Sequence, residues 1–80
     1  MIPCITPQQC RAARAWLDWT FEDLVKASGV SIATLVKFEK GTRVPHDRTL
    51  RDIAQAIETA GIELLFDGAK GVGIRMCTPG

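Results

Sequence analysis

The sequence has no long apolar run, no closely spaced pair of cysteines and only one histidine, and these absences exclude several classes of protein. A helix that crosses a bilayer needs roughly 18–20 apolar residues, which no stretch of this chain provides. The three cysteines, Cys4, Cys10 and Cys77, lie far apart, and the single His46 is near none of them in sequence. This spacing supports neither a zinc site nor a disulfide scaffold. We expect reduced thiols, with Cys10 serving as a small apolar residue on a helix.

The N-terminal residues 1–4 also lack the basic start and long apolar stretch of a secretion signal. Hydrophobic residues make up 46% of the chain and charged residues 24%, which is ordinary globular composition. The 80 residues suffice for about one domain. We therefore expect a single-domain cytoplasmic protein with no membrane association.

Positive and negative charges nearly balance over the whole chain, but they are unevenly distributed along it. Ten Lys and Arg stand against nine Asp and Glu, so the net charge is close to neutral. Between residues 31 and 51, however, five cationic residues face only two acidic ones. The rest of the chain is consequently slightly acidic, and this polarity is compatible with a polyanionic partner on one side of the molecule.

Capping and terminating residues mark the ends of the first two predicted helices. Thr6 is placed to cap a helix that has Pro7 at its first position and Gln9 completing a capping box, and that ends near residue 18. Thr20 is placed to cap a second, shorter helix that ends at residue 28, before Gly29. On the first helix we expect an apolar stripe at positions 10, 13 and 17, and we expect Trp19 to be more buried than Trp16.

A third helix is predicted from Ser31 to about residue 40, closed by Gly41. The helical spacing predicts that positions 35 and 38 face the core together with Val30, and that positions 32, 33, 36 and 37 face solvent. A fourth helix over residues 47–60 follows, and His46 precedes or caps it. Residues 62–66 and 72–77 read as strands joined by a turn-rich segment, which predicts a C-terminal β-hairpin.

Two short helices joined by a tight, glycine-containing turn form a helix-turn-helix pattern. The residues that carry it resemble those of the phage repressor and Cro-like (XRE-type) family, and they are Leu24, Gly29-Val30-Ser31, Leu35, Phe38-Glu39 and Gly41. The resemblance extends over roughly residues 5–62. It implies a mainly α fold, a four- to five-helix DNA-binding domain over residues 1–61, followed by a hairpin extension over residues 62–80.

The resemblance also implies functional residues. The third helix would enter the major groove of double-stranded DNA as the recognition helix. Base contacts are expected from Ile32, Ala33, Val36 and Lys37. Phosphate contacts are expected from Thr20, Ser31, Thr34, Lys40 and Arg43. Arg14 and Glu39 match positions that commonly form a structural ion pair, although both could instead be solvated surface charges.

Three positions depart from the family pattern. Phe21 stands where the family usually has a phosphate-clamping glutamine, Val25 where it usually has alanine, and Val36 where a polar residue is common. Together with Ile32, Val36 makes the outer face of the recognition helix apolar. Such a face could contact thymine methyl groups, or it could bind protein. The alternative to a DNA-binding regulator is therefore a protein-interaction module that keeps the helix-turn-helix fold.

The predicted hairpin has two open edges, and a small domain gains stability by pairing them. One face of the hairpin could cover the helices of its own chain. We expect it instead to pair with a second copy in a two-fold dimer. The dimerisation residues would be Ile62, Leu64, Phe66, Val72, Ile74 and Met76.

No catalytic constellation is apparent in the sequence. No nucleophile, base and orienting group recur at a useful spacing, and the glycine-rich segment 68–73 lies between predicted strands rather than before a helix. We expect no enzymatic activity, cofactor or small-molecule ligand. The function expected is that of a transcriptional regulator, a repressor or antitoxin-like autoregulator, which binds a two-fold operator as a homodimer.

Overall fold

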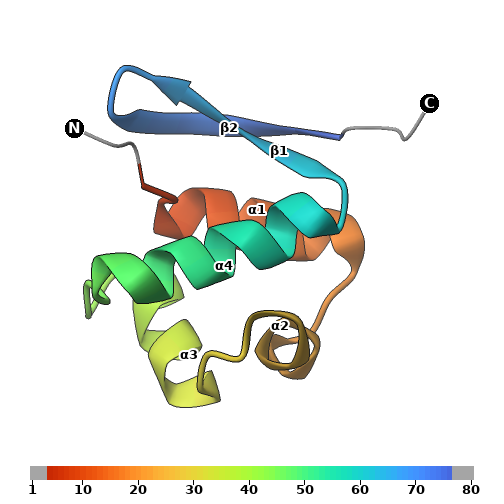
Figure 1. The fold of residues 1–80 in the computed structure, drawn as a ribbon, viewed down its shortest axis with the longest axis vertical. Helices are drawn as coiled ribbons and strands as arrows, with labels where there is room; N and C mark the ends of the chain where they lie inside the picture. Colours follow the sequence, from red (N-terminus) through yellow and green to blue (C-terminus); the bar gives the residue numbers. More distant parts are fainter. Residues whose placement is uncertain (1–3, 77–80) are drawn as a thin grey trace.

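The computed structural model describes residues 4–76, which form four helices and one antiparallel hairpin. The elements are α1 (Pro7–Leu17), α2 (Phe21–Ser28), α3 (Ile32–Lys40), α4 (Asp47–Thr59), β1 (Ile62–Asp67) and β2 (Lys70–Met76). In Figure 1 the hairpin lies on one side of α1 and α4, while α2 and α3 lie on the opposite side. The predicted fold class is confirmed. Cys77, predicted to belong to the second strand, lies outside the described residues.

Local side-chain chemistry sets the helix ends. At α1, Gln9 N donates to Thr6 Oγ1 at 3.2 Å and Thr6 N donates to Gln9 Oε1 at 3.0 Å, which completes the predicted capping box. Helix α2 begins with a second reciprocal box between Thr20 and Asp23. His46 occupies the N-cap position of α4 but makes no capping hydrogen bond through its side chain.

The core lies where the four helices and the first strand meet. Its fully or nearly fully buried apolar residues come from every element except β2, and they include Cys10, Leu24, Leu35, Ile53 and Ile62. Trp19 packs against this core, whereas Trp16 is 63% exposed, so the expected difference between the two tryptophans is confirmed. Because α3 and α2 both contribute to this core, their position relative to α1 is fixed by apolar packing.

The hairpin turn is shorter than the sequence predicted. Only Gly68 and Ala69 separate the strands, because Asp67 pairs with Lys70 and both belong to the ladder. Gly68 has a φ of 63°, the left-handed conformation that a tight hairpin turn favours and that glycine adopts without strain. The register then shifts beyond the pair of Leu65 and Gly73, which leaves Val72 as the extra residue of a β-bulge.

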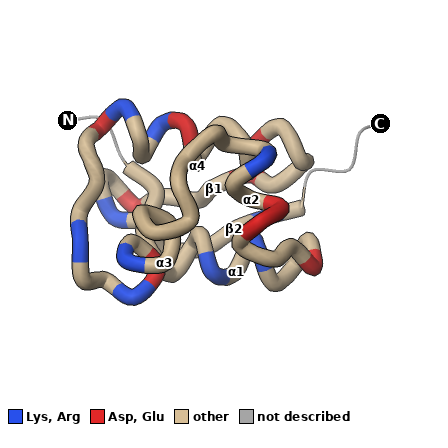
Figure 2. The backbone as a smooth tube through the Cα atoms, turned by 90° about the horizontal axis from the view of Figure 1, so that it is seen from below, with Lys and Arg blue, Asp and Glu red and all other residues tan. Residues whose placement is uncertain are grey.

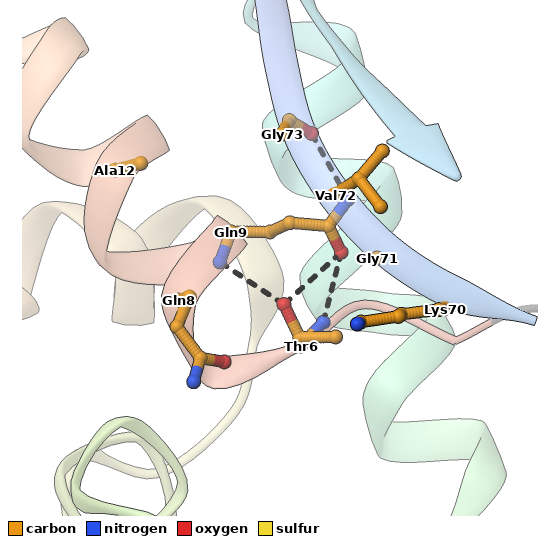
Figure 3. A pocket seen from close by; sticks show the side chains of 8 residues that line it. All are labelled: Thr6, Gln8, Gln9, Ala12, Lys70, Gly71, Val72 and Gly73. Carbon is orange, nitrogen blue, oxygen red and sulfur yellow. Dashed lines mark hydrogen bonds between the residues drawn. The ribbon is translucent and has the colours of Figure 1, made fainter. Parts of the chain in front are cut away.

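Gln9 fastens this hairpin to α1. Its Nε2 donates to the carbonyl oxygens of Leu65 at 2.8 Å and Gly73 at 3.0 Å, next to the bulge. Gln9 is 2% exposed, so its side-chain amide is shielded from water and must find its hydrogen-bond partners within the protein. A single amide therefore serves both the N-cap of α1 and the docking of the hairpin, which Figure 3 shows from close by.

Candidate nucleic-acid interface

The turn between α2 and α3 determines how α3 is presented. Helix α2 ends at Ser28, and the next residue, Gly29, has a φ of 75° in the left-handed region, so the chain reverses there without strain. Val30 follows and is 8% exposed, which anchors the turn in the core. Ser31 then caps α3, since its Oγ accepts a hydrogen bond from Thr34 N at 3.3 Å. With Leu35 and Phe38 buried, the opposite side of α3 faces solvent.

The four residues expected to contact bases lie on that outer side to different degrees. Ala33 and Lys37 are exposed, and Ile32 is 48% exposed. Val36 is only half-buried, because it lies at the border between the outer side and the core. Positions three and four apart are neighbours on a helix, so these four side chains form one continuous face. We call Ile32, Ala33, Val36 and Lys37 the α3 face.

The residues expected to contact phosphate are less uniform. Lys40 and Arg43 are exposed at the end of α3 and in the following loop, and Ser31 is exposed at the start of α3. Thr34 is half-buried, and its Oγ1 accepts a hydrogen bond from Ser31 Oγ at 2.9 Å. Neither of the salt bridges among residues 4–76 involves Lys40 or Arg43, so both cations are available to a ligand.

Thr20 lies in a different electrostatic setting from the rest of this group. Its backbone N–H donates to Asp23 Oδ2 at 2.9 Å, and Glu22 adds a second carboxylate to the first turn of α2. These carboxylates occupy the positive end of the helix dipole that a phosphate would use. Figure 2 shows this acidic segment at α2, while basic segments lie around α3 and the loop toward α4. The basic side of the interface is thus centred on α3.

An ion-pair network lies directly behind α3. Arg14 Nε donates to Glu39 Oε2 at 2.8 Å and Arg14 Nη2 donates to Glu39 Oε1 at 2.9 Å, so the two residues form a bidentate salt bridge. The Glu39 residue is 3% exposed. Hydrogen bonding to Glu39 raises the pKa of Arg14 above its usual value. This pair joins α1 to α3 inside the protein and does not lie on the α3 face.

Two neighbours extend the network. Cys10 Sγ donates to Glu39 Oε2 at 3.3 Å, and burial, followed by the charge of Glu39, raises the pKa of this thiol well above its ordinary value. Arg11 Nη1 donates to the backbone carbonyl of Glu39. Cys10 is therefore buried, as expected of a small apolar residue. Its thiol also has a hydrogen-bond partner that the sequence did not reveal.

Phe21 also belongs to the network, which sequence reasoning missed. The guanidinium carbon of Arg14 lies 4.1 Å from the centre of the Phe21 ring, a cation–π contact. Arg14 Nη1 additionally donates to the carbonyl oxygen of Trp19 at 3.0 Å. Arg14 thus connects α1, α2 and α3. The signal in the sequence was an aromatic residue at the start of α2 in place of the expected glutamine.

The hairpin residues expected at a dimer interface divide into two groups. Ile62 is 1% exposed and belongs to the core, while Leu64 and Ile74 pack against it. Phe66 is half-buried, whereas Val72 is 57% and Met76 47% exposed. Leu64 and Ile74 are cross-strand partners, so they share one face of the hairpin, and both pack against the core of the same chain. Ile62, Leu64 and Ile74 thus pack within their own chain, and their role in a dimer stays a prediction.

An open groove of about 640 Å³ runs between the start of α1 and β2. Figure 3 shows its lining, which consists of Thr6, Gln8, Gln9, Ala12, Lys70, Gly71, Val72 and Gly73. The buried amide of Gln9 is fully engaged with backbone carbonyls and Thr6, so it offers no unsatisfied group to a ligand. Among residues 4–76, no three His, Cys, Asp or Glu side chains are grouped to hold a metal ion.

Comparison with known proteins agrees with the arrangement of α2, the turn and α3. Residues 8–65, more than two thirds of the chain, match the family described as "Helix-turn-helix domain". No curated protein sequence matches the chain. In the described part of the chain, no helix has the length and apolar character needed to span a membrane. Domains of the helix-turn-helix type place their second helix in the major groove of DNA. From its sequence match and its geometry, the chain belongs to the helix-turn-helix domain family.

Proposed function

We propose that this protein is a sequence-specific DNA-binding regulator of transcription, of the phage repressor and Cro-like type, which binds a two-fold operator as a homodimer. The observation that carries the proposal is the exposed α3 face, bordered by the exposed cations Lys40 and Arg43, while the neighbouring carboxylate of Glu39 is buried. A repressor or an antitoxin-like autoregulator fits a domain of this size, which acts by occupying DNA and needs neither catalysis nor a cofactor.

Within this proposal, the side chains divide into two roles. Lys37 reaches the guanine O6 and N7 acceptors and contributes base preference. Lys40, Arg43 and the exposed Ser31 contact phosphates, and these contacts set affinity and register rather than sequence. In a dimer the two α3 helices would occupy successive major grooves about 34 Å apart. Thr20 is not one of these phosphate contacts, because two carboxylates adjoin it.

A salt titration tests the proposal. The probe is a duplex carrying the region upstream of the protein's own gene, and binding is followed by electrophoretic shift and fluorescence anisotropy. With Lys40 and Arg43 each neutralising one phosphate per subunit, four in the dimer, the slope of log K against log salt should be about −4. Absence of salt-dependent binding to this duplex and to a randomised pool would overturn the proposal. Salt-insensitive binding to a co-purified protein would instead support the interaction-module alternative.

Two substitutions test the division of roles. Lys37→Ala should narrow the affinity difference between specific and unrelated duplexes. Arg43→Ala should weaken binding to all duplexes alike and, because the dimer loses one contact per subunit, flatten the salt slope by about two. Lys70→Ala is the matched control, because Lys70 is an exposed cation in the hairpin, on the far side of the molecule from α3 (Figure 1). Equal loss of specificity from Lys37→Ala and Arg43→Ala would contradict the division.

The dimer is proposed to form through the hairpin. A two-stranded sheet has two open edges, and Val72 and Met76 add exposed apolar surface on β2. Size-exclusion chromatography with light scattering at micromolar concentration should give twice the monomer mass. Val72→Glu should shift the protein toward monomer, whereas Val44→Glu, at a residue 86% exposed in the loop before α4, should not. A monomer in the unsubstituted protein would refute the dimer.

A further inference from the structure

The part of α3 that would meet base edges is mostly hydrocarbon. Ile32 is 48% exposed, Ala33 is exposed, and Val36 contributes its half-buried side chain at the border of the same face. Ile32 and Val36 are four residues apart, so they lie in one row along the helix, with Ala33 beside them. Lys37 is the one long polar side chain on the α3 face.

The hydroxyl groups at the start of α3 have partners within the helix. Ser31 Oγ donates to Thr34 Oγ1 at 2.9 Å and accepts from Thr34 N at 3.3 Å. Reading a base edge with either hydroxyl would require this local arrangement to open. The first turn of α3 therefore presents mainly methyl and methylene groups toward the groove.

In the major groove, the C5-methyl group of thymine is the apolar feature of the base edges. Placing apolar side chains against the amino, carbonyl or ring-nitrogen groups of the other bases would desolvate those groups without replacing their hydrogen bonds. An apolar side chain that packs on the thymine methyl group covers no hydrogen-bonding group, so the contact avoids this cost and buries apolar area. The three apolar residues of the α3 face are therefore suited to methyl groups, and Lys37 is the residue of this face that can hydrogen-bond a base.

We infer that Ile32, Ala33 and Val36 select operator half-sites through thymine methyl groups, with a guanine where Lys37 reaches the groove. This inference rests on the proposed DNA binding and names the base chemistry that the same surface recognises. A DNA ligand is favoured over a protein partner because the exposed cations Lys40 and Arg43 border the apolar patch. A polyanion satisfies both features at once.

The test uses duplexes selected from a randomised pool by the protein itself. The best-binding duplex is then synthesised twice, once with thymine and once with uracil at each thymine of the half-sites, which removes only the methyl groups. Each buried methyl should contribute about a fourfold change in affinity. The uracil duplex should therefore bind more weakly while the salt slope stays the same, because no phosphate contact changes.

Equal affinity for the thymine and uracil duplexes would overturn this inference but leave the proposed DNA binding intact. Failure of the pool to yield any salt-dependent binder would overturn both. Ile32→Ala should reduce the ratio of thymine to uracil affinity toward one. Val44→Ala is the matched control, since Val44 is an aliphatic residue 86% exposed in the loop before α4 and lies outside the α3 face. Circular dichroism and thermal unfolding show whether each variant retains the fold.

Discussion

Replacing Arg14 with methionine removes the only guanidinium that pairs with the buried carboxylate of Glu39 in the described part of the chain. The Glu39 side chain is 3% exposed, so it cannot turn toward water when its partner is lost. It would keep the Cys10 thiol at 3.3 Å, a weak donor that does not neutralise the charge. The variant also loses the contact with the Phe21 ring and the hydrogen bond to Trp19.

The cost follows from this geometry. Breaking a buried ion pair from one side typically costs about 3–5 kcal/mol. A domain of 80 residues has a total stability of about 4–12 kcal/mol, so Arg14→Met would remove a large part of it. Changing the other partner of the pair, Glu39→Gln, should cost less, about 1–2 kcal/mol. Its amide is neutral, and the Arg14 side chain, at 22% exposure, can still reach water.

Urea unfolding followed by tryptophan fluorescence and circular dichroism measures these differences. Arg14→Met should also lower Tm by at least about 12 °C, since each kcal/mol shifts a domain of this size by about 4–8 °C. Arg75→Met is the control, because the salt bridge of Arg75 with Glu63 is exposed on the hairpin and should contribute less than about 1 kcal/mol. If Arg14→Met cost no more than Arg75→Met or Glu39→Gln, the assigned role of burial would be refuted.

Three further predictions concern α1 and the hairpin. Gly71→Ala places a Cβ against the hydrogen-bonded side chain of Gln9 and should destabilise the protein by about 1–3 kcal/mol in urea unfolding. Gly73→Ala, whose Cβ would lie 3.9 Å from its nearest neighbour, should cost less, and equal costs would refute the tight contact. Gln9→Glu retains an acceptor for the cap but cannot donate to the two hairpin carbonyls, so it should lower the free energy of unfolding by about 2–3 kcal/mol, more than Gln8→Glu at an exposed neighbour. In a variant with the other two cysteines changed to serine, Cys10 should react with a thiol reagent at pH 8 only as fast as the protein unfolds, because burial raises its pKa; rapid labelling of the native state would contradict this.

The helices could be predicted from the sequence because their ends depend on neighbouring residues. The Thr6 and Gln9 capping box, the caps at Thr20 and Ser31, and the left-handed Gly29 act over three or four positions, so the sequence contains the whole interaction. The hairpin turn was predicted too long, because the glycines at positions 68 and 71 both look like turn residues. Only the strand register shows that Gly71 belongs to β2.

The outward direction of the α3 face was predictable from the sequence, but the contacts that support α3 from behind were not. The outward direction of Ile32, Ala33 and Lys37 follows from helical periodicity and the buried positions between them. The Arg14 contact with Phe21 and the Cys10 contact with Glu39 join residues 7 and 29 positions apart on different helices. Such contacts depend on how the helices cross, which no local pattern specifies.

Because the amide of Gln9 closes the N-terminus of α1 and holds two carbonyls of the hairpin, these regions cannot loosen separately. Lifting the hairpin would leave a helix end with an unsatisfied group, and fraying that helix end would release the hairpin. Amide protons in both regions should therefore exchange with deuterium in one shared opening event, even though more than fifty residues separate them along the chain.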